Sequence, residues 1–571
     1  MMYKLLRTFC QGLRIPVFLY GLGLAPALAQ ESRPLPPVSR VYALEHVTVI
    51  PAPGRKLEDV TIIVRDGLIV DIGKGIAVPG EASRIAADSM YVYAGFIEGM
   101  SHTGIPRPKE DESGSAPRVS DPGNPPHQVA GIQPERTVAE VLKTDDKSIE
   151  TMRQLGFTLA HVAPRGNMLP GSTALVLLSG KDDDAMLYKT PVGAFSQLAP
   201  ARRVYPNTTM GVMAMWRTLY RQAELGHTHE KNYASNPVGM ARPAYEHTVR
   251  ALYPLADKSQ AVYFRADQPL DPYRIMTLQR ELGFRLVLTE LVHGTSVIPD
   301  IKAGNIPVYL SLDLPERPKP VSNGADSLSA AAQEKAALEK RQAEARTSLY
   351  QQAAAFAKAG IPFGFSTLKL KDKDFRTNLL LMIEHGLSED QALAALTTNP
   401  AAMLGISQAV GTVEKGKMAN LVITDKPFFT KEAQVRFVMV EGDMFMYEAT
   451  AKNPKSGAAA DTGSASVSAV GTWSYTTETP QGSSGGTIVI EDKNGTLSGT
   501  FDNDQADSPT SIESVSLNGN VLTLTFSVNA DGQQLPITVE VTLSGDTMTG
   551  TLSVASFGTF PLEGTRTAKP D

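Results

Sequence analysis

Residues 271–290 read DPYRIMTLQRELGFRLVLTE, and they place a helix pattern, a glycine and a strand pattern in immediate succession. Apolar residues recur at helical spacing up to Leu282, Gly283 suits the left-handed end of a helix, and the following residues favour a strand. The same order recurs at 137–163 and at 327–367. Strands that alternate with helices over about 300 residues favour a parallel sheet closed into a (β/α)₈ barrel. We therefore expect a TIM-like α/β barrel over residues 95–407.

The sequence on both sides of this region alternates apolar and polar residues in short strands. Residues 38–94 and 408–450 are rich in turn signals, and we expect them to form one composite β-sandwich. Residues 451–469 have the Ala, Ser, Gly and Thr content of a flexible linker. Residues 470–569 carry Thr- and Val-rich runs with recurrent turns, which predicts a separate all-β domain of roughly eight strands.

The first 29 residues have the pattern of a signal peptide. Lys4, Arg7 and Arg14 form a basic leader, an apolar run follows, and residues 27–29 read Ala-Leu-Ala, a small-x-small cleavage pattern. We therefore expect an exported protein, periplasmic or extracellular, that is not anchored by a membrane helix. Cleavage would also remove Cys10, the one cysteine of the chain. The mature protein would then have no thiolate to offer a metal or a substrate.

Composition and charge exclude some function classes. A hydrophobic fraction of 42% and a charged fraction of 20% are ordinary for a globular protein and argue against wholesale disorder. The formal net charge is −6, which does not favour nucleic acid as a partner. The acidity is uneven, because residues 470–571 hold twelve acidic and three basic side chains. The acidic tail therefore says nothing about the ligand of the barrel.

Three stretches resemble the amidohydrolase superfamily, and they are closest to its exported imidazolonepropionase-like and prolidase-like members. They are YVYAGFIEGMSHTGI at 91–105, LGFTLAHVAPRGNMLPGSTALVLLSG at 155–180, and ALAALTTNPAAMLGISQAVGTVEKGKMANLVI at 392–423. The resemblance covers about residues 40–447. It implies one or two divalent metals at the carboxyl end of the barrel strands, which activate a water molecule for attack on a C–N bond.

The residues at the matching ligand positions are mostly substituted. His102 matches one histidine of the first pair, and it is the candidate metal ligand, whereas Met100 occupies the other position. A thioether is a poor ligand for zinc or manganese. Arg265 occupies the position of the fifth-strand histidine, and a guanidinium has no lone pair to donate. Glu290 lies near the sixth-strand histidine position, and Thr367-Leu368 replaces a threonine-aspartate pair.

Arg265 and Glu290 are candidate catalytic residues with two further interpretations. They could form an ion pair in the space vacated by the metal, or Arg265 could bind a substrate carboxylate or phosphate. Arg165, which follows a predicted strand on a loop, is the candidate substrate-binding residue. We expect His161 to belong to the core. His227 and His229 form a His-x-His pattern, but their polar surroundings favour a solvated loop.

These observations leave the function open between alternatives. The resemblance implies a hydrolase that cleaves a C–N bond in a small cyclic amide or dipeptide-like substrate, with a divalent metal as cofactor. The substituted positions favour instead a catalytically silent binding or scaffold protein of the cell envelope. Metal-free chemistry by Arg265, Glu290 and His102 is the third possibility. In each case the partner is a small molecule, and a homo-oligomer or a paralogous partner subunit stays open.

Overall fold

The computed structural model describes twelve stretches of the chain. They are residues 41–85, 87–107, 119–180, 183–317, 330–447, 468–479, 482–493, 496–504, 509–518, 521–530, 533–554 and 558–568. The expected signal peptide and most of the expected linker lie outside the described residues. The chain divides into two compact units, Met1–Ala449 and Thr450–Asp571. Within the described residues, no helix combines the length and the apolar character that crossing a bilayer requires.

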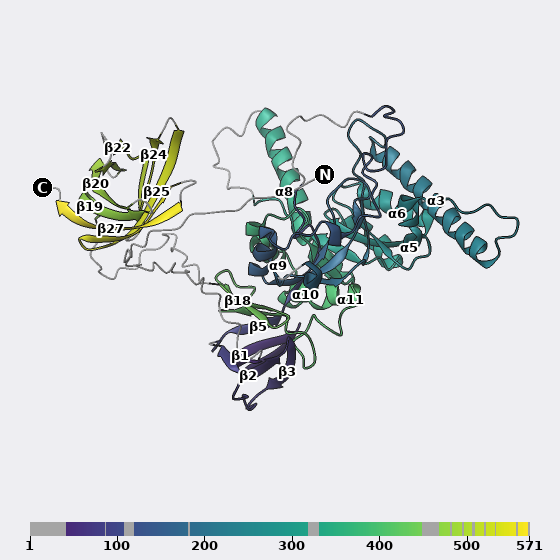
Figure 1. Cartoon of the computed structure of the whole chain (residues 1–571), viewed down its shortest axis with the longest axis horizontal. Helices are drawn as coiled ribbons and strands as arrows, with labels where there is room; N and C mark the ends of the chain where they lie inside the picture. Colours follow the sequence, from purple (N-terminus) through teal and green to yellow (C-terminus); the bar gives the residue numbers. More distant parts are fainter. Residues whose placement is uncertain are drawn as a thin grey trace, which may run out of the picture. The chain divides into compact units, whose positions relative to one another are not determined.

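Strands from both ends of the first unit form one eight-stranded sheet. Its order is β18-β17-β16-β5-β1-β2-β3, and β4 pairs with β1. Figure 1 shows the purple strands near the start of the chain in one layer with the green strand β18. The members are β1 (Val41–Ala52), β2 (Arg55–Arg65), β3 (Leu68–Gly73), β4 (Ser83–Ile85), β5 (Tyr91–Ala94), β16 (Leu421–Thr424), β17 (Val435–Val440) and β18 (Asp443–Met446). The composite region is therefore one sheet with its own apolar core.

Between these strands lie two further sheets with the expected helix-to-strand order. One has the order β10-β9-β7-β6 and the other the order β15-β14-β13-β12-β11-β8. The strands are β6 (Phe96–Ser101), β7 (Phe157–Val162), β8 (Gly171–Ser172), β9 (Ala174–Leu177), β10 (Leu187–Lys189), β11 (Gly193–Gln197), β12 (Ala261–Arg265), β13 (Arg285–Leu291), β14 (Val308–Ser311) and β15 (Phe363–Ser366). All pairs from β11 to β15 are parallel, as is the pair of β6 and β7.

The expectation of an all-parallel barrel is wrong in one place. Strand β8 pairs with β11 in the antiparallel direction, and β9 pairs with β7 in the antiparallel direction. No helix pattern separates β7 from residues 171–177. The loop at 163–170 between them is too short for a crossover connection, which needs a dozen or more residues. The segment 171–177 therefore returns beside β7 as a hairpin strand.

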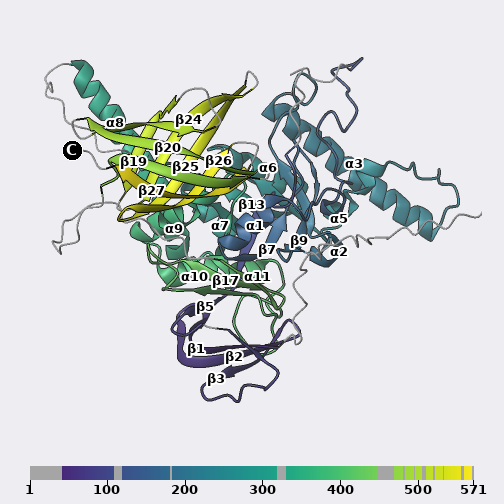
Figure 2. The ribbon, with the colours of Figure 1, turned by 60° about the vertical axis from the view of Figure 1, so that its left-hand side comes forward.

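Helices connect and cover these strands (Figures 1 and 2). They are α1 (Lys147–Gln154), α2 (Asp183–Met186), α3 (Thr209–Ser235), α4 (His247–Arg250), α5 (Tyr253–Ala256), α6 (Asp271–Leu282), α7 (Ile298–Ala303), α8 (Ala330–Lys358), α9 (Phe375–Glu384), α10 (Glu389–Leu396) and α11 (Thr398–Met403). Gly283 ends α6 with a φ of 75°, which explains the glycine between this helix and β13. Helix α1 is shorter than its sequence pattern because Asp146 caps it by accepting a hydrogen bond from Ser148 N.

The second unit is a single curved sheet of nine described strands (Figure 2). Its order is β22-β21-β20-β19-β27-β26-β25-β24-β23, and every pair is antiparallel. The strands are β19 (Gly471–Thr479), β20 (Gly482–Lys493), β21 (Thr496–Asn503), β22 (Thr510–Ser511), β23 (Ser514–Asn518), β24 (Val521–Ala530), β25 (Gln533–Ser544), β26 (Thr547–Val554) and β27 (Gly558–Ala568). Trp473 and Tyr475 are buried in its core, as their alternation along the strand predicts.

Candidate functional site

The predicted site residues gather at one end of the two central sheets. His102 directly follows β6, Arg165 follows β7, Arg265 ends β12, and Glu290 lies next to the last residue of β13. Parallel strands bring their carboxyl ends to one edge, so these residues share one end of the fold. The two sheets also meet there, because Thr367 N donates a hydrogen bond to the carbonyl oxygen of Met100 in β6 at 3.1 Å. We call this region the mouth.

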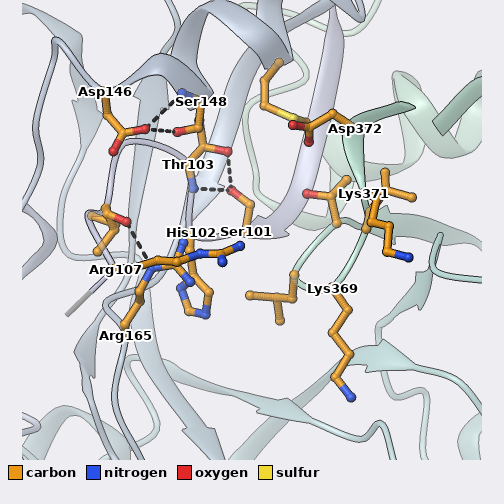
Figure 3. A pocket seen from close by; sticks show the side chains of 15 residues that line it. Ser101, His102, Thr103, Arg107, Asp146, Ser148, Arg165, Lys369, Lys371 and Asp372 are labelled. Carbon is orange, nitrogen blue, oxygen red and sulfur yellow. Dashed lines mark hydrogen bonds between the residues drawn. The ribbon is translucent and has the colours of Figure 1, made fainter. Parts of the chain in front are cut away.

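A cavity of about 640 Å³ opens at the mouth (Figure 3). It brings together two of the four predicted site residues, His102 and Arg165, and leaves Arg265 and Glu290 outside its lining. The lining residues are Ser101, His102, Thr103, Ile105, Arg107, Asp146, Ser148, Met152, Arg165, Thr367, Leu368, Lys369, Leu370, Lys371 and Asp372.

His102 is held as a neutral imidazole. Its Nδ1 lies 2.8 Å from the carbonyl oxygen of Ala163, so Nδ1 carries the proton and donates it to that carbonyl. Burial lowers the pKa of His102 to about 4, and the charges of Arg165 and Arg265 act in the same direction. Nε2 is therefore a hydrogen-bond acceptor at neutral pH.

Glu290 is fully buried between two serines. Its Oε1 lies 2.6 Å from Ser311 Oγ, and its Oε2 lies 2.6 Å from Ser366 Oγ. Ser366 Oγ also lies 3.0 Å from the carbonyl oxygen of Met100. Since a hydroxyl has one proton, both contacts of Ser366 are satisfied when Glu290 is protonated and donates to Ser366. Burial raises the pKa of Glu290, which agrees with a neutral carboxyl group.

Arg265 is paired, but its partner is not Glu290. Its guanidinium donates to Gln197 Oε1 at 2.9 Å and to Asp267 Oδ2 at 3.0 Å. Lys369 forms a second ion pair with the same carboxylate. The expected ion pair with Glu290 is thus replaced, because Asp267 reaches the guanidinium while the carboxyl group of Glu290 is bonded to Ser311 and Ser366. Burial alone would raise the pKa of Asp267, but Lys369 and Arg265 bring it below its usual value.

Sequence reasoning missed Glu98 in the middle of β6. The side chain is fully buried and accepts hydrogen bonds from Thr103 Oγ1 at 3.0 Å and from Thr367 Oγ1. Burial raises its pKa to about 8. Both threonines line the cavity, so Glu98 lies directly beneath its floor. An acidic residue inside an otherwise apolar strand, in the stretch GFIEGM, was the available signal.

The other histidines lie away from the cavity. His161 is buried, with Nδ1 3.1 Å from Gly99 O and Nε2 2.8 Å from Thr173 Oγ1, as expected of a core residue. His227 and His229 lie within helix α3, so the expectation of a loop is wrong. The helix continues through Gly226 because residues 221–235 contain no proline, and a single glycine inside a helix costs only about 1 kcal/mol.

Comparison with known proteins shows what the chain resembles. The sequence model of the amidohydrolase family matches residues 350–445. A solved amidohydrolase from Thermotoga maritima MSB8 matches with a TM-score of 0.57 and 18% identity, over 71% of this chain and 100% of that chain. The predicted resemblance to the amidohydrolase superfamily is confirmed, by the family model over residues 350–445 and by the fold of the solved amidohydrolase.

Two further solved structures are similar at lower scores. A prolidase complexed with n-methylphosphonate-l-proline has 16% identity and a TM-score of 0.41, over 72% of this chain and all of that chain. A Xaa-Pro dipeptidase with bound methionine has 14% identity and a TM-score of 0.39, over 71% of this chain and all of that chain. A search of curated proteins found no significant match.

The mouth does not fit the metals that the resemblance to the amidohydrolase superfamily implies. Among the residues that the structure describes, no group of three or more His, Cys, Asp or Glu side chains is arranged to hold a metal ion. Met100 is fully buried and packs in a cluster with Phe195, Tyr263 and Tyr309. Glu290 is hydrogen-bonded to serines and neutral, and Arg265 is a cation. Of the positions that match the ligands of the family, His102 is the one that keeps a nitrogen able to bind a metal.

Proposed function

We propose that this chain is an exported small-molecule-binding member of the amidohydrolase superfamily whose mouth works without the metals of the family. One observation carries the proposal. A cavity lies at the mouth, while Met100, Arg265 and Glu290, which occupy substituted ligand positions, contact protein partners or the apolar core. Glu290 and the terminal amino groups of Arg265 have protein partners, and Met100 packs in an apolar cluster, so the substituted side chains form part of a packed interior.

We propose that the two central sheets close into one barrel, as in the family. On one side the segment 171–177 supports closure, because Gly171–Ser172 pairs with β11 while Ala174–Leu177 pairs with β7. On the other side Ser366 Oγ, on the last residue of β15, and Thr367 N, on the residue after it, both donate to the carbonyl of Met100. Such a barrel has seven strands in one direction and one in the other.

The interior beneath the mouth favours a binding role over metal catalysis. Tyr309 is fully buried on β14, and its ring lies against Gly99 of β6 and Gly364 of β15, where an added Cβ atom would come within 2.1 Å and 2.7 Å of the ring. The tyrosine therefore fills the space that these glycines leave. With Met100 and Phe195 it forms a packed apolar cluster in the interior.

Hydrolysis of a C–N bond is the alternative that the family favours, and it is tested by an activity assay. The full chain is incubated with a panel of Xaa-Pro dipeptides, with and without added Zn²⁺ or Mn²⁺. We expect no turnover above the rate of a buffer control, because the mouth cannot assemble a metal-bound water. Metal-dependent turnover that is lost in His102→Ala and kept in His247→Ala, an exposed histidine of α4, would contradict the proposal.

Export is the part of this proposal that rests on sequence alone. The basic leader, the apolar run and the Ala-Leu-Ala pattern support it. Expression of the full gene product, followed by separation of the cellular fractions and sequencing of the mature amino terminus, tests it. We expect a mature chain that begins at Gln30, whereas an uncleaved cytoplasmic chain would overturn this part.

A further inference from the structure

The cavity has an excess of positive charge on a chain that is acidic overall. Its lining holds four basic side chains, Arg107, Arg165, Lys369 and Lys371, and two acidic ones, Asp146 and Asp372. The lining therefore has a formal charge of +2, whereas the whole chain has −6. Figure 3 shows the two arginines with His102 on one wall and the two lysines on the other. Such a lining concentrates small anions near the mouth.

Arg165 is fixed in place, and its outer edge remains available. Its Nε donates to the carbonyl of Ile105 at 3.0 Å, and its own carbonyl accepts a hydrogen bond from Arg136 at 3.0 Å. These bonds orient the guanidinium but use neither of its terminal amino groups. A planar fork that is already positioned loses little entropy when it binds a carboxylate or phosphate.

Arg107 adds a second guanidinium beside the first. Burial lowers the pKa of Arg165, and the charge of Arg107 lowers it further, so the two cations repel each other in the free protein. Within the described part of the chain, neither arginine has a carboxylate within ion-pair distance. Asp146 is nearby, but its Oδ1 accepts hydrogen bonds from Ser148 N at 2.9 Å and from Ser148 Oγ at 2.6 Å. An anion between the two arginines would relieve the repulsion.

The basic side chains of the opposite wall are not equivalent. Lys369 is an ion-pair partner of Asp267, which Arg265 also contacts, so its charge is largely compensated. Lys371 has no ion pair among the described residues and is exposed. The uncompensated charge of the lining therefore concentrates at Arg107 and Arg165, with Lys371 facing them across the cavity.

We propose that the mouth binds a small molecule through an oxyanion group, a carboxylate or a phosphate, held between the guanidinium groups of Arg107 and Arg165. The inference rests on the proposed function, because it takes the metal-free cavity as the binding site. Bidentate hydrogen bonds from Arg165 fix the orientation of the anion, and Arg107 completes the charge balance. The neutral Nε2 of His102 lies on the same wall and can accept a hydrogen bond from the rest of the ligand.

Isothermal titration calorimetry on the full chain tests this proposal. The protein is first stripped of metal on a chelating resin, because soluble chelators are themselves polycarboxylates. The probes are inorganic phosphate and succinate, which separate the two kinds of anion, and succinamide is the neutral control. We expect one of the two anions to bind saturably, with an affinity that falls as the ionic strength rises, and succinamide not to bind.

Charge-removing variants locate the binding site. Arg165→Gln and Arg107→Gln should each weaken binding of the anion tenfold or more, and Arg165→Lys should lose most of the affinity because it keeps the charge without the planar fork. Arg84→Gln removes a charge from an exposed ion pair with Glu45 and should leave the affinity within twofold of the wild type. Since Arg107 is exposed, its variant remains informative even if Arg165→Gln fails to fold.

The outcomes separate this inference from the proposed function. Failure of both anions to bind below about 10 mM, or an equal effect of Arg84→Gln and Arg165→Gln, would overturn the oxyanion site and leave the metal-free mouth standing. Binding that disappears when metal is stripped, and returns when Zn²⁺ or Mn²⁺ is added, would overturn the proposed function instead. Binding that survives stripping and depends on both arginines supports both.

Discussion

Two buried carboxyl groups lie at the mouth, that of Glu98 beneath the cavity and that of Glu290 between two serines. The rule that parallel strands end at one edge placed His102, Arg165, Arg265 and Glu290 at the same end of the fold, and the structure places them there. Their partners could not be predicted, because contacts such as that of Glu290 with Ser311 and Ser366 depend on how strands far apart in the sequence pack. Glu98 was missed because the sequence does not show that its side chain is buried or that Thr103 and Thr367 bind its carboxyl group.

The neutral state of Glu98 predicts a loss of stability as the pH rises. Burial raises its pKa from 4.5 to about 8, so the folded protein holds this proton more tightly than the unfolded chain does. The stabilisation is complete below about pH 4.5 and is lost as the pH rises toward 8, by at most about 1.4 kcal/mol per pH unit. Glu98→Gln should remove this dependence. Urea unfolding of the first unit at pH 6 and pH 8 measures the change in the free energy of unfolding in the wild type and in the variant.

A matched surface variant controls for the general effect of pH. Glu150→Gln on α1 removes an exposed carboxylate and should leave the pH dependence of the wild type unchanged. If Glu98→Gln and the wild type lose the same stability between pH 6 and pH 8, Glu98 does not carry the buried proton.

The hydrogen bonds of Glu290 give a second prediction for a single residue. Glutamine can accept from Ser311 through Oε1 and donate to Ser366 through Nε2, which reproduces the bonds of a protonated glutamate. Glu290→Gln should therefore change the free energy of unfolding by less than about 1 kcal/mol, whereas Glu290→Ala should cost about 2–5 kcal/mol by leaving a cavity. A loss in Glu290→Gln as large as that in Glu290→Ala would show that the native carboxyl group is ionised.

At the scale of elements, local patterns were reliable where a helix, a glycine and a strand follow one another. Helix α6, Gly283 and β13 lie where the opening stretch predicted them. The antiparallel segment at 171–177 was not predictable from periodicity, because a short apolar run has no direction of its own. The continuation of α3 through His227 was missed because polar residues suggested a loop, although a polar helix face has the same composition.

The close approach of β6 and β14 predicts a strict requirement for glycine at position 99. A Cβ atom there would lie 2.1 Å from Tyr309 Cδ1 and 2.5 Å from the carbonyl oxygen of Phe365. Gly99→Ala should destabilise the first unit by about 1–3 kcal/mol or more, since neither neighbour can move without disturbing the packed interior. Gly80→Ala, where an added Cβ meets nothing within 4 Å, should stay within about 0.5 kcal/mol of the wild type. Equal stabilities by urea unfolding would refute this packing.

At the scale of the whole molecule, the two units have separate cores and different charge. The apolar core of the second unit consists of its own strands, among them those of Trp473 and Tyr475. The net negative charge of the chain also lies in residues 470–571, which hold twelve acidic and three basic side chains. The boundary was predictable because the composition changes sharply at residues 451–469, whereas the curvature of the nine-stranded sheet depends on pairing that the sequence pattern does not specify.

Separate cores predict separate unfolding. Scanning calorimetry of the full chain should show two transitions, because each unit buries its own apolar surface. A chain that ends at residue 449 should keep the transition of the first unit at the same temperature within about 2 °C. A single transition in the full chain, or a large shift on truncation, would mean that the units stabilise each other.

The metal content of the purified chain tests the central claim most directly. The full chain is produced in medium that contains Zn, Mn, Fe and Ni, purified without chelators, and measured by elemental mass spectrometry. Because Met100, Arg265 and Glu290 are unsuited or committed elsewhere, we predict well below one metal ion per chain, and the same content in His102→Ala. One or two ions per chain that disappear in His102→Ala would contradict a metal-free mouth.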